Sequence, residues 1–215
     1  MRIIWVIRHA EREDNINQNW QSLPEAKGLG RDNSMLSARG RIQAKECADR
    51  FADVNIAHLF ASPYDRTIET ATYIAERKGL LIKPEAGLCE VLTECHHPPL
   101  FWDTSQLKKK FPLVDTDYKP VYTKDTMPPE LEGDESCIPR VRRTLREIIQ
   151  KYDGDLLLVS HGAPVGAIHQ VWGGSFTYVG QATVSKFVEK EKGVVDLQYS
   201  SDCSHLSDKS NLRPF

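Results

Sequence analysis

Residues 3–12 read Ile3-Ile4-Trp5-Val6-Ile7-Arg8-His9-Ala10-Glu11-Arg12. The first five residues form a short, continuous apolar run rich in β-branched side chains, which is typical of a buried strand in a parallel sheet. An arginine and a histidine follow at the point where this strand should end. Ligands of open α/β sheets bind outside the carboxyl ends of the strands. The stretch therefore predicts both a fold class and the edge of the sheet where a site should lie.

The rest of the chain alternates strand and helix patterns. Apolar runs predict three more strands, at 56–61, 80–82 and 156–159. Apolar residues at helical spacing predict four helices, at 37–51 with Ser37 as N-cap, 63–79, 138–152 and 164–171. A hairpin that turns at Lys192-Gly193 is predicted for 185–189 and 194–199. This alternation predicts an α/β fold, a three-layer sandwich with a mostly parallel central sheet and helices on both faces.

Its length of 215 residues suits one domain of this class, so we expect residues 1–215 to form a single domain. Residues 93–136 contain many prolines and little periodicity. They are predicted to be an excursion from the core rather than a second domain. Residues 11–33 are polar and predict a loop with broken helix, and the polar tail from Ser200 favours no particular structure.

Composition narrows the class of protein. The net charge is -2 and gives no basic excess of the kind that nucleic-acid binding requires. Five cysteines are scattered without a CxxC pair, which favours a reducing compartment over a disulfide framework. No apolar run approaches the roughly 18 residues of a membrane span, and the apolar stretch at the start is too short for a signal peptide. We therefore expect a cytoplasmic protein that binds neither nucleic acid nor membrane.

A zinc site is conceivable at Cys95-His96-His97. Three adjacent residues cannot all point at one metal ion, however, and the spaced second pair of ligands that such sites need is missing. We therefore predict that these histidines lie in a loop near the mouth of the site. Neither a metal nor a cofactor is predicted.

Two histidines, three arginines and one carboxylate follow the four predicted strands. They are Arg8, His9, Arg12, Arg66, Glu90 and His161. Parallel strand ends share one sheet edge, so these residues should lie together. Arginine binds phosphate through planar, bidentate donors. One neutral imidazole could attack phosphorus while the other donates hydrogen bonds to the charge that develops.

A separate acid must protonate the leaving alcohol. Glu90 is the candidate because it lies on the same edge outside the arginine cluster, and Glu94 is the substitute. A plainer role for Arg66 is a salt bridge to Asp65 or Glu69. An arginine is nevertheless a poor partner for the dipole at a helix N-terminus, which weakens a purely structural role.

Together these residues resemble the histidine phosphatase (phosphoglycerate mutase-like) superfamily. Its signature is an Arg-His-Gly tripeptide after the first strand and a second histidine after a later strand. Four stretches carry the resemblance in the same order, at 6–12, 36–44, 61–71 and 158–162. Within the superfamily the chain most resembles the phosphatase domain of the TULA (suppressor of T-cell receptor signalling) proteins and the insect ecdysteroid-phosphate phosphatases. That likeness lies in Arg12 and in residues 87–90 and 114–120.

The resemblance implies a phosphomonoester hydrolase that forms a phosphohistidine on His9. It further implies Glu90 as general acid and a phosphate held by four residues, Arg8, Arg12, Arg66 and His161. The substrate expected from it is a phosphotyrosine protein, a steroid phosphate or another small phosphorylated molecule. A homodimer is also expected, since twofold dimers are the commonest assemblies.

Two alternatives stay open. A phosphoglycerate mutase would share the nucleophile but return the phosphate to its product. A degenerate member of the superfamily would bind phospho-ligands without turnover. Ala10 supports the second alternative because the superfamily usually has glycine there, and glycine often marks a positive φ or a close approach to ligand.

Overall fold

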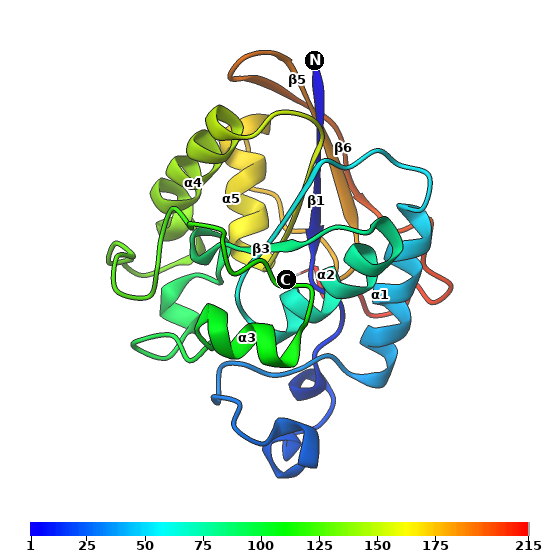
Figure 1. The fold of residues 1–215 in the computed structure, drawn as a ribbon, viewed down its shortest axis with the longest axis vertical. Coiled ribbons are helices and arrows are strands. Elements are labelled where there is room, and N and C mark those ends of the chain that lie inside the picture. Colours follow the sequence, from blue (N-terminus) through cyan, green and yellow to red (C-terminus); the bar gives the residue numbers. More distant parts are fainter. Residues whose placement is uncertain (215) are drawn as a thin grey trace.

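The computed structural model describes residues 1–214, and a six-stranded sheet runs through its centre (Figure 1). The strands are β1 (Arg2–Arg8), β2 (His58–Ala61), β3 (Ile82–Pro84), β4 (Leu156–Ser160), β5 (Val184–Glu191) and β6 (Val194–Asp202). Their order is β3-β2-β4-β1-β5-β6. The first four in this order are parallel, and β5 and β6 complete the sheet antiparallel to their neighbours. The predicted mostly parallel sheet is confirmed.

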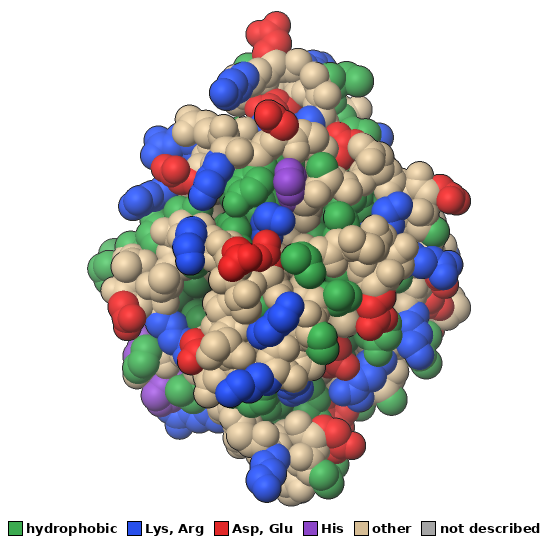
Figure 2. All heavy atoms as spheres, viewed as in Figure 1, with side chains coloured by type: hydrophobic (Ala, Val, Ile, Leu, Met, Phe, Trp, Pro, Cys, Tyr) green, Lys and Arg blue, Asp and Glu red, His purple; other side chains and the backbone are tan. Residues whose placement is uncertain are grey.

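Helices cover both faces of the sheet (Figure 1). They are α1 (Ala38–Arg50), α2 (Asp65–Lys78), α3 (Thr104–Lys110), α4 (Ile138–Lys151) and α5 (Gly162–Gly173). Side chains alternate between the faces along a strand, so Trp5 and Ile7 pack with α1 and α2 whereas Ile4 and Val6 pack with α4 and α5. The structure thus has the predicted three layers. Acidic and basic side chains are interspersed on the face shown in Figure 2.

Local sequence signals mark the start of helix α1 and the end of helix α2. Ser37 is the N-cap of α1, as predicted, and its hydroxyl accepts a hydrogen bond from the Gly40 N–H at 2.9 Å. Gly40 itself is required by close packing, because a Cβ there would lie 2.1 Å from the Glu11 carbonyl oxygen. Gly79 ends α2 in the left-handed region, with φ +64°.

The predicted third strand is wrong by two residues. It was expected at 80–82 and lies at Ile82–Pro84. Leu80 lies in the turn that ends α2, since its N–H donates to the Ala75 carbonyl, and Leu81 is 46% exposed. Ile82 is the first residue that pairs with β2. The apolar run therefore marked the turn into the strand rather than the strand itself.

Residues 93–136, the predicted excursion, contact the edge of the sheet, where Val114 pairs with Ile82. Its helix α3 was not predicted, although Asp103 and Gln106 form a capping box at its start. Buried Glu85, just after β3, holds the returning segment by accepting hydrogen bonds from the Tyr118 hydroxyl at 2.6 Å and the Val121 N–H at 2.7 Å. A buried carboxylate thus joins the excursion to the edge of the sheet that carries the candidate site.

The remaining predictions concern the end of the chain. The hairpin of β5 and β6 is confirmed, with Gly193 at φ +86° in its turn. The tail returns to the centre of the molecule, where the Leu212 carbonyl accepts a hydrogen bond from the Gln181 N–H. In residues 1–214 no helix has both the length and the apolar character needed to span a membrane.

Candidate active site

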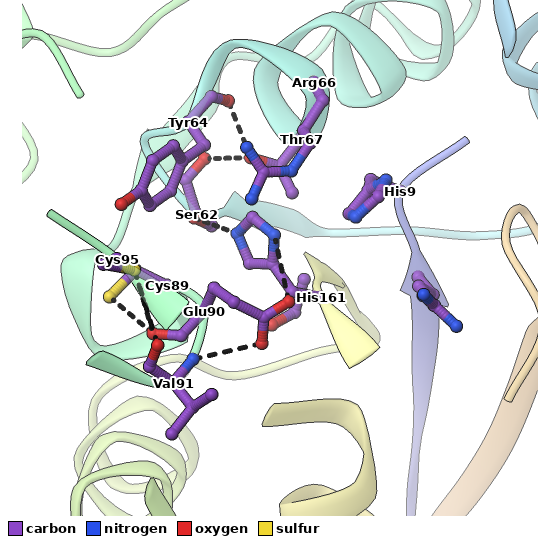
Figure 3. A network of polar contacts seen from close by, with 12 residues as sticks. His9, Ser62, Tyr64, Arg66, Thr67, Cys89, Glu90, Val91, Cys95 and His161 are labelled. Atoms are coloured by element: carbon purple, nitrogen blue, oxygen red, sulfur yellow. Dashed lines mark hydrogen bonds and ion pairs between the residues drawn. The ribbon is translucent and has the colours of Figure 1, made fainter. Parts of the chain in front are cut away.

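Two histidines face each other at the carboxyl ends of the central strands. His9 follows β1 directly, and His161 follows β4 as the N-cap of α5. Their ring centroids lie 5.2 Å apart at an interplanar angle of 65° (Figure 3). Exposure is 1% for His9 and 0% for His161. Strands β1 and β4 are parallel neighbours, which is why residues 152 positions apart meet as the sequence predicted.

The surroundings of His9 fix its tautomer and keep its imidazole neutral. Its Nδ1 lies 2.7 Å from the Ala10 carbonyl oxygen, which can only accept a hydrogen bond. Nδ1 therefore carries the proton, and Nε2 keeps its lone pair. Burial, followed by the charges of Arg66 and Arg8, holds the pKa of His9 well below its usual 6.5. The imidazole is consequently neutral at physiological pH.

The backbone around His9 is fixed by a strained neighbour. The N–H of Ala182 is shared between the carbonyl oxygens of Arg8, at 3.0 Å, and His9, at 3.2 Å. Ala182 adopts a φ of +57°, which is unfavourable for a residue other than glycine. His205 bonds the Ala182 carbonyl at 2.9 Å from the C-terminal segment. The segment beyond β6 thus helps to hold the turn that presents His9.

His161 is oriented from one side only. Its Nε2 lies 2.7 Å from the Ser62 hydroxyl, and its ring meets the Tyr64 ring edge-on at 5.3 Å. Its Nδ1 has no hydrogen-bond partner within residues 1–214 and lies 4.0 Å from Glu90 Oε2. Burial and the charge of Arg66 also lower the pKa of His161 well below 6.5. A proton on Nδ1 would point toward the gap between His161 and Glu90.

Arg66 is a buried cation with an N–H donor that is unpaired within residues 1–214. It is 2% exposed, it stacks over the Tyr64 ring at 4.6 Å, and it donates to the Asp32 carbonyl at 3.1 Å. Its Nε–H has no partner within the described residues. The plainer alternative, a salt bridge to Asp65 or Glu69, is wrong because those carboxylates pair with Lys110 and Arg41.

Arg8 and Arg12 differ in their partners, since Arg8 bonds main-chain carbonyls whereas Arg12 pairs with a carboxylate. Arg8 donates through one terminal nitrogen to the carbonyls of Val179 and Arg213, and its Nε–H is unpartnered. Burial is the main reason that the pKa of Arg8 is lowered to about 10. Arg12 makes a bidentate ion pair with Asp14 at 2.7 and 2.5 Å. Because Asp14 already balances its charge, Arg12 should hold an anion less strongly than Arg66.

A cavity of about 390 Å³ opens beside this cluster. It is lined by Arg12, Asp14, Arg31, Asp32, Arg66, Glu90, Thr93, Glu94, Cys95 and His96. The Glu90 side chain is 15% exposed, and its Oε1 accepts from the Val91 N–H at 3.0 Å (Figure 3). Glu94 lines the same cavity but is exposed. Of the two predicted acids, Glu90 is therefore the one whose carboxylate lies against the histidine pair.

Ala10 occupies its place without strain. The non-glycine residues with positive φ in the described chain are Ala182, Ser201, Asn211 and Arg213. Ala10 is absent from this set, is fully buried in the core and donates its N–H to the Thr70 hydroxyl at 3.2 Å. A methyl group is therefore accommodated at the position where the superfamily usually has glycine.

The two loop histidines, His96 and His97, lie in different surroundings. His96 lines the cavity, as expected, whereas His97 is exposed and does not. Asp32 was not predicted, although its carboxylate accepts from the Tyr64 hydroxyl at 2.9 Å and from the His96 N–H at 2.9 Å. Ser62, which bonds His161, was visible in the sequence as a polar residue at a strand end. Asp32 lies in an irregular loop and offered no such signal.

Comparison with known proteins identifies this arrangement. The family model described as "Histidine phosphatase superfamily (branch 1)" matches residues 4–178. The chain belongs to the histidine phosphatase superfamily. Among curated proteins of this superfamily, it is 28% identical over 169 residues to "Probable phosphoglycerate mutase GpmB" of Enterobacter sp. (strain 638). That match covers 77% of this chain and 72% of the mutase.

Solved structures of the superfamily share its fold. The ecdysone phosphate phosphatase EPPase from Bombix mori, solved with tungstate, superposes with a TM-score of 0.67 at 20% identity and covers 94% of this chain and 93% of its own. A phosphoserine phosphatase mutant from Entamoeba histolytica, in complex with phosphoserine, gives 0.64 at 19% identity and covers 96% and 100%. The resemblance read from the sequence is thereby confirmed for family and fold. Phosphatases and mutases both stand among the relatives.

Proposed function

We propose that the chain is a phosphatase that hydrolyses phosphomonoesters through a phosphohistidine on His9. The observation that carries this proposal is a neutral, buried His9 whose ring centroid lies 5.2 Å from that of His161 and whose pKa is lowered by the charge of Arg66. A neutral imidazole with a free lone pair is a nucleophile. The donors around it suit a group that gains negative charge on its equatorial oxygens.

The reaction has two steps. Nε2 of His9 attacks phosphorus, the bond from phosphorus to the ester oxygen breaks, and the proton of Glu90 goes to the departing alkoxide. The Glu90 carboxylate then takes a proton from water as that water attacks the phosphohistidine. Inorganic phosphate leaves, and His9 and protonated Glu90 are restored. Each residue thus returns to its starting state.

Unpaired donors support the binding of phosphate. Of the buried nitrogens that lack hydrogen-bond partners within residues 1–214, three belong to predicted site residues, namely Arg8 Nε, Arg66 Nε and His161 Nδ1. Buried donors without partners are costly to a fold and call for an explanation at each position. A phosphoryl dianion would satisfy all three donors, and Arg12 would add charge from the rim of the cavity.

The substrate proposed is a small, hydrophilic phosphomonoester. Every residue that lines the cavity carries a polar or ionisable side chain, which suits a leaving group with hydroxyl, amino or carboxyl functions. An apolar hollow of about 210 Å³, lined in part by Phe101 and Trp102, shares no residue with this cavity. A steroid or a phosphotyrosine ring would therefore find little apolar surface in the polar cavity.

A phosphate-release assay over a panel of phosphomonoesters tests this proposal. The panel should pair glycerol phosphate, phosphoserine and phosphoglycerate with phosphotyrosine and a steroid phosphate. We expect release from the hydrophilic group at higher kcat/KM than from the two apolar substrates. A clear preference for the steroid phosphate would contradict the assignment of substrate.

The same assay separates the two alternative functions. Transfer of phosphate from one phosphoglycerate to another, without release to water, would identify a mutase, which the GpmB relative keeps open. Binding of inorganic phosphate with no turnover of any ester would identify a degenerate binding protein. Either result would contradict hydrolysis as the activity.

Arg66 provides a direct test of the phosphate site. The change Arg66→Ala should raise the barrier for hydrolysis by about 2–4 kcal/mol. It removes a preorganised hydrogen-bond donor from the negative charge of the phosphoryl group. Arg66→Lys keeps the positive charge but loses the planar fork, and it should recover only part of the loss. Steady-state kcat/KM for both variants measures the effect. Unchanged kinetics in Arg66→Ala would remove this residue from the site.

A further inference from the structure

Arg140 is a fully buried arginine outside the phosphate cluster. It lies on α4 and is 1% exposed. Its terminal nitrogens donate to three main-chain carbonyls, those of Gly87 at 2.9 Å, Cys89 at 2.9 Å and Glu90 at 3.2 Å. All three acceptors belong to the loop that carries Glu90. The guanidinium thus fixes the backbone of the proposed acid itself.

Glu130 completes this arrangement from the excursion. Its Oε1 accepts from Arg140 Nε at 2.6 Å, and its Oε2 accepts from the Leu92 N–H at 2.6 Å. Both side chains are buried, and the side chains alone are 0% exposed for Arg140 and 1% exposed for Glu130. Arg140 therefore bonds the loop on the N-terminal side of Glu90, and Glu130 bonds it on the C-terminal side.

Stability alone is a weak reason for such a pair. Removing two charges from water costs about as much as their attraction returns, and well-packed apolar residues often stabilise a core equally well. What apolar residues cannot do is accept or donate the hydrogen bonds that set the backbone of residues 87–92. Within residues 1–214, the side-chain hydrogen bonds of Arg140 and Glu130 are all with this loop or with each other.

We propose that Arg140 and Glu130 are positioning residues that hold the Glu90 carboxylate opposite His161 for proton transfer. This inference rests on the proposed role of Glu90 as general acid. Glu90 Oε2 lies 4.0 Å from His161 Nδ1, and a shift of about 1 Å in a reacting group can cost on the order of 100-fold in rate. Neither residue touches the phosphate site. Their effect should therefore be confined to the step in which the leaving group needs a proton.

The excursion acquires a role from this inference. Glu85 anchors its middle at Val121, and Glu130 anchors its end at Arg140 and Leu92. The buried carboxyl groups of Glu85 and Glu130 thereby join a segment with little sequence periodicity to the loop that carries Glu90. We infer that its return across the strand ends supplies the second half of the support for Glu90.

The test compares two leaving groups in a double variant, Arg140→Met with Glu130→Met. Replacing both partners avoids leaving one buried charge unpaired. We expect hydrolysis of glycerol phosphate to slow by about 10- to 100-fold, since misplaced groups lose rate steeply. Nitrophenyl phosphate, whose leaving group hardly needs a proton, should stay within about threefold of the parent. Arg146→Met, an exposed change on the same helix, is the matched control and should alter neither rate.

A second variant keeps the proposal testable if the double variant does not fold. Arg140→Lys retains the charge toward Glu130 but cannot reach three carbonyls with one ammonium group. It should show the same selective loss for glycerol phosphate and a shift in the pH dependence of that rate. An equal slowing of both substrates, or no slowing in a folded variant, would overturn the proposal.

Glu90→Gln, measured in parallel, separates two ways of failing. If Glu90→Gln slows glycerol phosphate selectively but the Arg140 variants do not, the positioning role is wrong and the acid assignment stands. If Glu90→Gln itself shows no dependence on the leaving group, Glu90 is not the acid. That result would overturn the positioning role as well, while leaving hydrolysis through His9 in place.

Discussion

Replacing His9 by alanine is expected to abolish phosphate release, with a fall in kcat of at least about 10⁴-fold, as for other enzymes that lose their nucleophile. The reason is that Nε2 of His9 is the attacking atom. His161 cannot substitute for it, because its Nε2 is engaged with Ser62. Steady-state release of phosphate from glycerol phosphate measures the loss.

Loss of folding must be separated from loss of chemistry. His9 is buried, so alanine leaves a small cavity, whereas His9→Asn keeps a polar side chain of more similar size. Both variants should melt cooperatively and should still bind inorganic phosphate through the arginines. Turnover in either folded variant at more than a few per cent of the parent rate would exclude His9 as nucleophile.

Glu90→Gln should slow glycerol phosphate by about 10²- to 10⁴-fold, the usual contribution of a general acid. An aliphatic alkoxide is a poor leaving group and needs the proton that glutamine cannot give. Nitrophenolate leaves readily without one, so nitrophenyl phosphate should slow far less. The ratio of the two kcat values is the measurement, and it should fall sharply in this variant.

Glu94→Gln is the natural control for this experiment. Glu94 lines the same cavity but is exposed, so its replacement should leave the ratio unchanged. Equal slowing of both substrates by Glu90→Gln would show that Glu90 acts in some other way. A changed ratio in Glu94→Gln alone would move the acid to that residue.

The sequence predicted those parts of the site that follow from strand order. His9 and His161 each come two positions after the last residue of a buried apolar run, and parallel strands bring such positions to one edge. Arg66 follows from the same logic, because a helix starts after β2. These predictions depended only on local patterns and on the rule that parallel strand ends share an edge.

Other parts of the site depend on contacts that no local pattern encodes. Glu130 and Arg140 both meet the Glu90 loop, one from an irregular segment and one from the buried face of α4. In the sequence, Arg140 is one of several charged residues on an amphipathic helix, and its burial becomes visible only once the excursion covers it. The same holds for Asp32, whose partners Tyr64 and His96 lie far along the chain.

The predicted start of β3 was wrong because the sequence of a turn resembled that of a strand. Leu80 and Leu81 form an apolar run with Ile82. Leu80 nevertheless lies in the left-handed turn at Gly79, where its N–H donates to the Ala75 carbonyl of α2. Periodicity over three residues cannot distinguish these cases. The helix α3, by contrast, could have been found from its capping box, because Asp103 and Gln106 have the right spacing.

Detection of phosphate on His9 during turnover tests the central claim most directly. The protein would be mixed with substrate, quenched in alkali to preserve phosphohistidine, digested and examined by mass spectrometry. We predict one phosphate on the peptide that contains His9, lost on brief exposure to acid and absent from the His9→Asn variant. Full turnover with no phosphate on His9, or with phosphate on another side chain, would contradict the account.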